Sequence, residues 1–166
     1  KGVSKVFSMT GWRIGYAAGH KELIKSISKI QSQCTTNPCS ISQMAAMFAL
    51  ENKKTFLKDW LVKFEDRKNF LVNFFSSVEG FKPFIPQGAF YLYVSSDGFI
   101  GKKYNDDKLI SNDLDFSEFL LNHANVAVVP GIAFGKSPYF RLSYATSLEE
   151  LKKACLQIEE SLKKLF

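Results

Sequence analysis

The chain has 166 residues, of which 46% are apolar and 23% are charged, and its formal net charge is +6. These proportions are ordinary for a globular protein with a real core, and the sequence contains no internal repeat or low-complexity tract. The lysines are scattered among acidic residues rather than grouped with aromatic ones, so nucleic-acid binding is not expected and a pocket for a small anion fits the charge better.

The cysteines and histidines argue against the common metal centres. They are Cys34, Cys39, Cys155, His20 and His123, and they match no zinc spacing and no disulfide framework. Sparse cysteines suit a reducing cytoplasm. The sequence contains no run of about 18 apolar residues and no signal peptide, so we expect a cytoplasmic protein without a membrane span.

Residues 1–34 predict two short strands followed by a helix. Apolar runs separated by glycine indicate strands at 3–7 and 13–18, with a tight turn at Thr10-Gly11 between them. Apolar residues at helical spacing then predict a helix over 21–33.

Two further helices are predicted in the middle of the chain. The Asn37-Pro38 pair indicates a loop, since the residue before proline is biased away from the helical conformation. One helix then starts near Ser40 or Ser42, and a long one runs from after Asn52 to about Ser77, as a helix that links two domains would. The expected buried stripes are Ile41, Met44, Ala45, Phe48 and Ala49 in the first helix, and Leu57, Trp60, Leu61, Phe64, Leu71, Phe74 and Phe75 in the second.

The last part of the chain predicts a small α/β layer. The expected strands cover 81–85, 89–94, 126–129 and 139–144, and the polar residues 95–112 are expected to form a surface loop. Two capping boxes, Asp115 with Glu118 and Ser147 with Glu150, predict the starts of two helices. The first of these ends near residue 124 and the second runs to the end of the chain.

The densest motif lies at residues 2–16, with the sequence Gly-Val-Ser-Lys-Val-Phe-Ser-Met-Thr-Gly-Trp-Arg-Ile-Gly-Tyr. It resembles the cofactor-lysine segment of the class I and II aminotransferases, which use pyridoxal 5'-phosphate. The resemblance implies that Lys5 forms a Schiff base with the cofactor and later moves a proton at the substrate Cα. It also implies that Arg13 binds the cofactor phosphate. A lysine amine whose pKa shifts readily and a planar, permanently charged guanidinium are suited to these two roles.

A second motif, Tyr-Phe-Arg-Leu-Ser-Tyr-Ala-Thr at residues 139–146, resembles the C-terminal segment of the same family. The resemblance implies that Arg141 binds the substrate α-carboxylate. An unpaired charge among aromatic neighbours is costly to bury, and an anionic ligand would remove that cost. Residues 33–38 resemble a loop that approaches the partner subunit's active site, and residues 86–91 and 128–131 resemble two segments that face the cofactor cleft.

The resemblance covers the whole chain and implies the C-terminal part of a fold type I enzyme of mixed α/β class. Residues 1–53 would be the edge of the large cofactor-binding domain, 54–77 a helix between domains, and 78–166 the small α/β domain. The implied enzyme is a homodimer that transfers an amino group from L-aspartate to 2-oxoglutarate, giving oxaloacetate and L-glutamate. The motifs look most like the bacterial aspartate/prephenate subgroup, and aromatic amino acids or prephenate stay open as substrates.

The same resemblance implies that residues contacting the cofactor ring are missing. The chain opens at Lys1, directly in a dense motif, and we expect an N-terminal part to precede it. The isolated chain is therefore expected to be inactive. Two other interpretations stay open: a non-catalytic fragment, and a basic module that binds nucleic acid or phosphate ligands. A salt-dependent affinity for DNA would favour the basic module.

Overall fold

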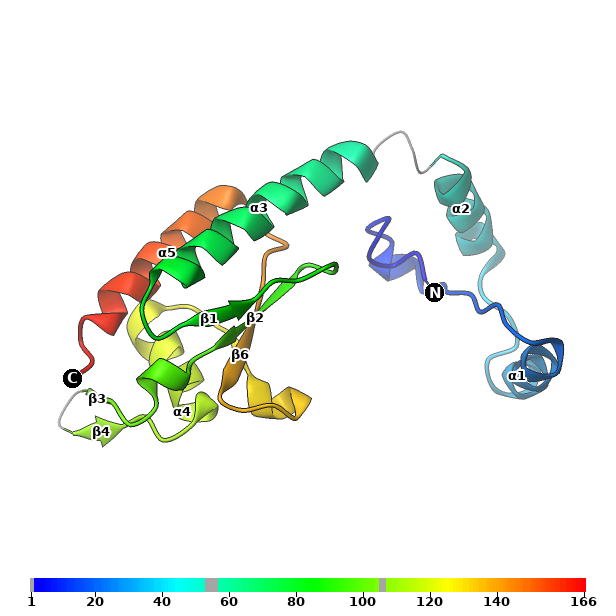
Figure 1. The fold of residues 1–166 in the computed structure, drawn as a ribbon. Helices are drawn as coiled ribbons and strands as arrows, with labels where there is room; N and C mark the ends of the chain where they lie inside the picture. The colour runs from blue at the N-terminus through cyan, green and yellow to red at the C-terminus, as the bar shows by residue number, and fades with distance from the viewer. Residues whose placement is uncertain (1, 53–56, 105–106) are drawn as a thin grey trace. The chain divides into compact units, whose positions relative to one another are not determined.

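The structure is a computed structural model that describes residues 2–52, 57–104 and 107–166. It divides into two compact units, Lys1–Trp60 (the N-terminal unit) and Leu61–Phe166 (the C-terminal unit). Figure 1 shows helices in both units and a sheet in the second, so the chain is of mixed α/β class, as expected. Lys1 and the predicted first turn of the long helix lie outside the described residues.

The N-terminal unit is built from a turn-rich segment followed by helices. The elements are the 3-10 helix η1 (Thr10–Trp12), α1 (Lys21–Cys34), α2 (Ser40–Glu51) and the start of α3 (Leu57–Ser77). Helices α1 and α2 confirm the helices predicted from apolar spacing, and α3 confirms a long helix that ends at residue 77.

The two strands predicted at 3–7 and 13–18 are wrong. Residues 4–7 form turns, and pairing within this described segment is limited to a single antiparallel bridge between Gly2 and Gly15. Ser8 and Arg13 have φ angles of 52° and 49°. This left-handed conformation cannot continue an extended strand.

The buried face predicted for α2 is right only in part. Ile41, Met44 and Phe48 are 70%, 61% and 67% exposed, whereas Ala49 is buried as predicted, together with Ala46. The two alanines pack with Val3 and Met9 of the N-terminal segment, and Ala45 contacts this cluster. Small side chains let the turn-rich segment lie close to the helix backbone, so the face with small residues is the buried one.

The C-terminal unit contains a four-stranded antiparallel sheet with the order β1-β2-β6-β5. The strands are β1 (Lys82–Phe84), β2 (Tyr91–Ser95), β5 (Val129–Pro130) and β6 (Tyr139–Ser143). Strand β6 is central and pairs with β2 along its whole length, from Tyr91 opposite Ser143 to Ser95 opposite Tyr139. Strands β1, β2 and β6 confirm the strands predicted at 81–85, 89–94 and 139–144, whereas β5 overlaps the strand predicted at 126–129 only at Val129.

Phenylalanines form the centre of the core of the C-terminal unit. The ring of Phe75 on α3 lies 5.1 Å from that of Phe81 and 5.8 Å from that of Phe140 on β6, and all three side chains are buried. Phe116 on α4 (Asp113–Phe119) closes the group at 5.7 Å from Phe140. Buried aromatic side chains contribute large apolar areas, so this cluster fixes β6 against the helices. Figure 1 shows α3 and α5 (Leu148–Leu162) side by side over the sheet.

The surface loop predicted at 95–112 is structured instead. It contains the 3-10 helix η2 (Asp97–Phe99) and a small hairpin of β3 (Lys103–Tyr104) and β4 (Lys108–Leu109). Phe99, Tyr104 and Ile110 are 5%, 3% and 0% exposed. Single apolar residues spaced five or six apart reach the core here, a spacing that matches neither helix nor strand periodicity.

The capping box predicted from Asp115 and Glu118 is three residues too late. The N-cap of α4 is Asn112, whose Oδ1 accepts a hydrogen bond from the backbone N–H of Asp115 at 3.0 Å. The Asp115 carboxylate in turn accepts from the backbone N–H of Ser111 at 2.8 Å. The helix therefore begins at Asp113, and Asp115 is its third residue.

The other predicted cap is confirmed. Ser147 Oγ accepts a hydrogen bond from the backbone N–H of Glu150 at 3.1 Å, at the start of α5. Helix α4 continues into one π-helical turn, η3 (Leu120–Ala124), which ends where the sequence predicted. A last 3-10 helix, η4 (Gly131–Phe134), follows β5 and precedes β6.

Candidate active site

Lys5 lies on the turn near the start of the N-terminal unit. Its backbone carbonyl accepts a hydrogen bond from the N–H of Ser8 at 3.2 Å, and the N–H of Phe7 donates to the carbonyl of Val3 at 3.2 Å. Val3 is 1% exposed, whereas the Lys5 side chain is exposed. The backbone around Lys5 is thus fixed by a buried neighbour, and its ε-amine stays accessible to a ligand.

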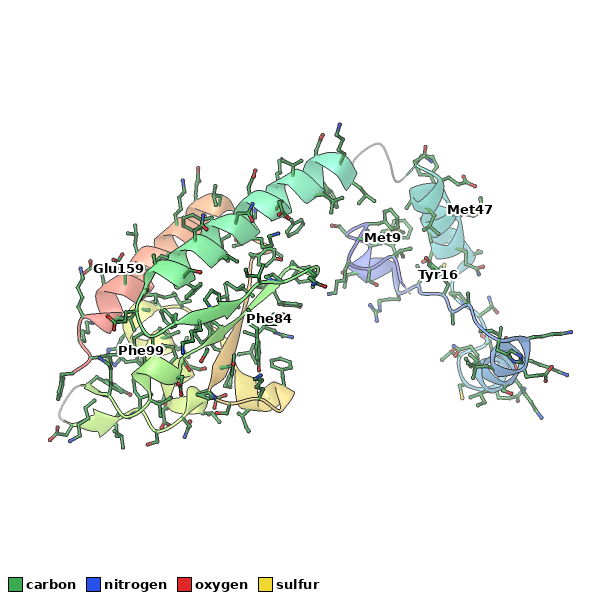
Figure 2. All side chains as sticks on the ribbon, in the orientation of Figure 1. Met9, Tyr16, Met47, Phe84, Phe99 and Glu159 are labelled. Carbon is green, nitrogen blue, oxygen red and sulfur yellow. The ribbon has the colours of Figure 1, made fainter. Side chains whose placement is uncertain are left out.

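Arg13 lies on the same compact segment, directly after η1. Its Nη1 donates to the backbone carbonyl of Thr10 at 2.9 Å, and Thr10 Oγ1 donates to the carbonyl of Ser4 at 3.1 Å. Met9 is 7% exposed and fixes the segment to the core of this unit (Figure 2). Lys5 and Arg13 are therefore carried by one hydrogen-bonded segment, and both side chains are exposed.

An amine and a guanidinium on one fixed segment fit a ligand that carries an aldehyde and a phosphate. A primary amine can attack a carbonyl carbon, and a guanidinium binds a phosphate through charge-assisted hydrogen bonds. Both side chains of this segment meet the requirements of pyridoxal phosphate in residue type and in accessibility. The turn conformation, rather than the predicted strands, is what brings residues 4 and 10 into contact.

Arg141 occupies the centre of the sheet in the C-terminal unit. It lies opposite Tyr93 on β2 and opposite Val129 on β5. Its Cζ atom lies 4.2 Å from the ring centroid of Tyr91 and 4.1 Å from that of Phe134. The guanidinium thus makes cation–π contacts with two aromatic rings, which stabilise its positive charge.

The polar edge of Arg141 is left unsatisfied. Its Nε is buried and has no hydrogen-bond partner among the described residues, and no carboxylate in that part of the chain forms an ion pair with it. A buried donor without an acceptor costs about 1–3 kcal/mol. Arg141 as a whole is half-buried, so the rest of its guanidinium is open to a ligand, and the planar fork of arginine matches a carboxylate through two parallel hydrogen bonds.

Sequence reasoning missed Tyr93 and Phe134, which lie beside Arg141. The Tyr93 hydroxyl shares its single proton between the carbonyls of Gly131 and Lys136, each at 3.1 Å, and so contacts both ends of the turn that carries Phe134. Burial, and then the nearby Asp113 carboxylate, raise the pKa of Tyr93, so its hydroxyl stays a donor. The advance signal was the resemblance of segments 86–91 and 128–131 to segments that face the cofactor cleft, which include Tyr91 and Gly131 but not Tyr93 or Phe134.

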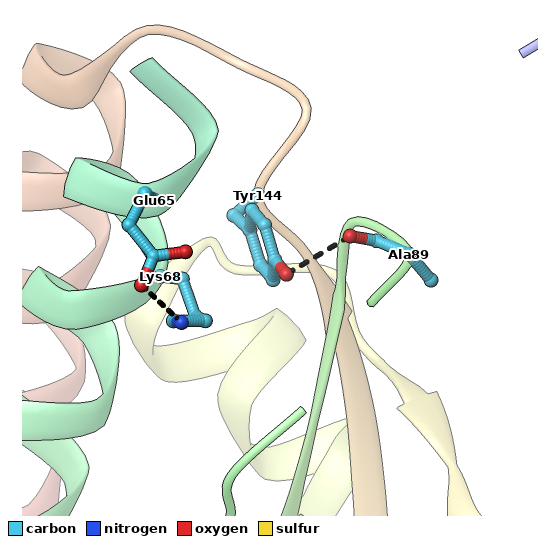
Figure 3. A network of polar contacts seen from close by, with 4 residues as sticks. All are labelled: Glu65, Lys68, Ala89 and Tyr144. Carbon is cyan, nitrogen blue, oxygen red and sulfur yellow. Dashed lines mark hydrogen bonds and ion pairs between the residues drawn. The ribbon is translucent and has the colours of Figure 1, made fainter. Parts of the chain in front are cut away.

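The structure brings two of the sequence motifs together. The Tyr144 hydroxyl, from the segment of Arg141, donates to the carbonyl of Ala89 at 3.1 Å, as Figure 3 shows. The Tyr144 backbone N–H donates to the carbonyl of Phe90 at 2.9 Å. Burial, and then the charge of Glu65, raise the pKa of Tyr144. The segments 86–91 and 139–146 therefore form one connected wall beside Arg141.

The predicted site residues are divided between the two units of the chain. Lys5 and Arg13 belong to the N-terminal unit and Arg141 to the C-terminal unit. The segment 33–38 covers the end of α1 and an exposed loop. Residues 2–52, 57–104 and 107–166 contain no group of three potential metal ligands, and none of their helices is long and apolar enough to cross a membrane.

Comparisons with known proteins agree with the motifs. The family model described as "Aminotransferase class I and II" matches residues 1–158. A Rickettsia felis protein described as "Probable aspartate/prephenate aminotransferase" is 51% identical over 160 residues, which cover 96% of this chain and 39% of that protein.

Solved structures of aminotransferases also match nearly the whole chain. The crystal structure of the aspartate aminotransferase from Rhizobium meliloti matches 99% of this chain and 41% of its own, with a TM-score of 0.95 and 47% identity. An aromatic aminotransferase from Pyrococcus horikoshii matches 98% of this chain and 41% of its own, with a TM-score of 0.85 and 33% identity. The chain thus spans about two fifths of the length of these relatives.

Proposed function

Because the chain belongs to the class I and II aminotransferases, we propose that the full-length protein containing it transfers an amino group from L-aspartate to 2-oxoglutarate. The observation that carries this proposal is the Arg141 guanidinium, which lies over two aromatic rings and forms no ion pair with a carboxylate of the described residues. Amino acids and 2-oxo acids share an α-carboxylate, which is the group that such an arginine binds best.

The family is pyridoxal-phosphate-dependent, and we assign the cofactor contacts to the segment that carries Lys5 and Arg13. Arg13 would hold the phosphate, and Lys5 would hold the cofactor through its ε-amine. When bound, the cofactor supplies the electron sink for the reaction. Once the substrate amine has displaced it from the cofactor, the freed Lys5 amine would accept the proton from the substrate Cα and deliver it to the cofactor C4′, as a general base and acid already in place.

Arg141 would orient the substrate. A bidentate pair with the α-carboxylate fixes two atoms of the amino acid and so restricts the direction of its Cα–H bond. The Tyr91 and Phe134 rings cover part of the guanidinium, and lower exposure to water would strengthen the pair. This arrangement selects amino acids as a class, and the side chain must be read elsewhere.

Aspartate is the proposed donor because the Rhizobium meliloti relative, at 47% identity, is described as an aspartate aminotransferase. Prephenate and aromatic amino acids are the alternatives, and the Rickettsia felis and Pyrococcus horikoshii relatives support them by their descriptions. We further propose a cytoplasmic homodimer, with the large domain ending near residue 53, a helix at 54–77 and the small domain at 78–166. The 166 residues alone are proposed to be inactive.

Lys5 is tested by substitution in the full-length protein. Lys5→Ala should lower the rate of aspartate-dependent amino transfer by more than about 1000-fold, since the general base and the cofactor-holding amine are lost together. Lys21→Ala is the matched control, because Lys21 is also exposed but lies on α1. Borohydride treatment of the wild type with pyridoxal phosphate should label Lys5 in a mass spectrum. Full activity of Lys5→Ala, or label spread over the surface lysines, would contradict the assignment.

Arg141 is tested by its effect on substrate affinity. Arg141→Ala should weaken aspartate binding by about 3 kcal/mol, or roughly 100-fold, because a charge-assisted bidentate contact is lost. Arg67→Ala is the matched control, since the Arg67 guanidinium also lies over a ring, at 5.3 Å from Phe64, but on α3. Unchanged affinity in Arg141→Ala would overturn the carboxylate assignment. Salt-dependent DNA binding without cofactor binding would favour the basic-module alternative.

A further inference from the structure

The C-terminal unit contains a buried carboxylate that the proposed chemistry does not use. Asp113, the first residue of α4, is 2% exposed. Its Oδ2 accepts a hydrogen bond from the backbone N–H of Ile132 at 2.6 Å, and its Oδ1 accepts from the Ser137 hydroxyl at 2.6 Å. Burying a carboxylate is expensive unless its acceptors are satisfied. Here both oxygens are satisfied by one turn, residues 131–137.

The turn at 131–137 is fixed at its base from several directions. The N–H of Lys136 donates to the carbonyl of Gly131 at 3.1 Å, and the Tyr93 hydroxyl bonds to both of those residues. A Cβ atom on Gly131 would lie 2.1 Å from the Lys136 carbonyl oxygen, so the closure of the turn requires glycine at this position. The Asp113 carboxylate adds the two contacts that tie the turn to α4.

The turn carries Phe134, one of the two rings beside Arg141. Phe134 is 48% exposed, so burial in the core does not hold its ring in place. The ring nevertheless lies 4.1 Å from the Arg141 Cζ atom, and it contacts Tyr93 edge-on at 6.4 Å between centroids. The position of the ring therefore depends on the backbone of the turn, and Asp113 supplies the contacts that tie this turn to α4.

We propose that Asp113 is a positioning residue for Arg141: it fixes the 131–137 turn, which holds Phe134 against the guanidinium and keeps that group aimed at the substrate carboxylate. This inference rests on the proposed function, in which Arg141 binds the α-carboxylate. In this role Asp113 acts through its contacts with Ile132 and Ser137 and is assigned no contact with substrate or cofactor. Loss of its contacts would let the turn and the guanidinium take several orientations, of which one binds carboxylate.

The test is a comparison of affinity with turnover in the full-length protein. Asp113→Ala should raise the KM for both aspartate and 2-oxoglutarate about 10-fold, while kcat at saturation stays within about 3-fold, since the reacting groups are untouched. Asp113→Asn should recover much of the affinity, because an amide can accept from Ile132 and donate to Ser137. Asp115→Ala is the control, as that carboxylate also lies in the first turn of α4 but bonds to Ser111.

A double-mutant cycle separates this inference from the proposed function. In an Arg141→Ala background, Asp113→Ala should have no further effect on KM, because its effect runs through Arg141. If Arg141→Ala alone leaves KM unchanged, the proposed function fails. If Arg141→Ala raises KM and Asp113→Ala does not, the positioning role alone fails. Should Asp113→Ala not fold, Phe134→Ala replaces it: this half-exposed ring can be removed without opening the core, and unchanged KM would overturn the proposal.

Discussion

Cys155 lies on the buried face of α5 and is 3% exposed, and burial raises the pKa of its thiol to about 12 from an ordinary value of 9.0. The thiolate form is disfavoured in the core, so the native state keeps a proton that the unfolded chain loses above pH 9. This thiol is therefore expected to be chemically inert in the folded protein. Cys34 and Cys39 are exposed, so their side chains are open to reagents.

The buried thiol predicts a loss of stability at alkaline pH. Below pH 9 the thiol is protonated in both the folded and the unfolded state, so its full contribution to the free energy of unfolding is present. Between pH 9 and about 12 the unfolded state alone loses its proton, so the free energy of unfolding should fall by about 1.4 kcal/mol per pH unit from this group. Urea unfolding of the chain, followed by far-ultraviolet circular dichroism from pH 8 to pH 10.5, measures the slope.

Cys155→Ala is the control for this slope. The variant should be less stable at pH 8, since a buried side chain is shortened, but its stability should fall less steeply above pH 9. Tyr93 and Tyr144, whose pKa values are also raised by burial, contribute equally to both proteins. Equal slopes in wild type and variant would refute the assignment to Cys155.

The residues identified from the sequence are those that stand inside dense local motifs. Lys5, Arg13 and Arg141 could be selected because their neighbours in sequence carry the resemblance. Asp113 and Phe134 could not, because their roles depend on contacts across long stretches of chain. The Asp113 carboxylate reaches residues 19 and 24 positions later, and such contacts follow from the fold rather than from any spacing.

At the scale of elements, helices were predicted better than strands. Apolar spacing identified α1, α2 and α5, since a helix repeats its pattern over several turns. The segments 3–7 and 13–18 are short and apolar, which is compatible with strand or turn. Val3 and Met9 pack against the alanines of α2, and this packing favours the turn conformation over a strand. Tertiary packing of this kind overrides local propensity.

The α2 helix illustrates the difference between a correct element and a correct face. The helix itself was predicted correctly, and Ala49 of its predicted stripe is buried. The larger members of that stripe, Ile41, Met44 and Phe48, are exposed, and Ala46 is buried instead. Periodicity tells which residues share a face, and the size of the neighbouring side chains decides how closely another segment approaches. A bulky apolar stripe left exposed is expected to promote association between copies of the chain.

At the scale of the whole molecule, the two units differ strongly in the size of their cores. The core of the C-terminal unit includes seventeen buried residues among those the structure describes. The corresponding cluster of the N-terminal unit contains four. Helix α1 buries none of its residues, and its Leu23 and Ile30 are 58% and 65% exposed. Because burial of apolar area is the main source of stability, the units should open with very different free energies.

Limited proteolysis of the 166-residue chain should therefore cut first within residues 1–60 and leave a resistant product covering most of 61–166. Cleavage requires local opening, and opening of a unit with a small core costs less. Phe75→Ala provides the control, since this ring is 0% exposed and contacts Phe81 and Phe140. The substitution should lower the free energy of unfolding of the C-terminal unit by about 3–5 kcal/mol and so abolish the protease resistance of the C-terminal product. The rate of cleavage within 1–60 should stay unchanged. Early cuts inside 61–166 of the wild type, or equal resistance of both units, would show that core size does not set their relative stability.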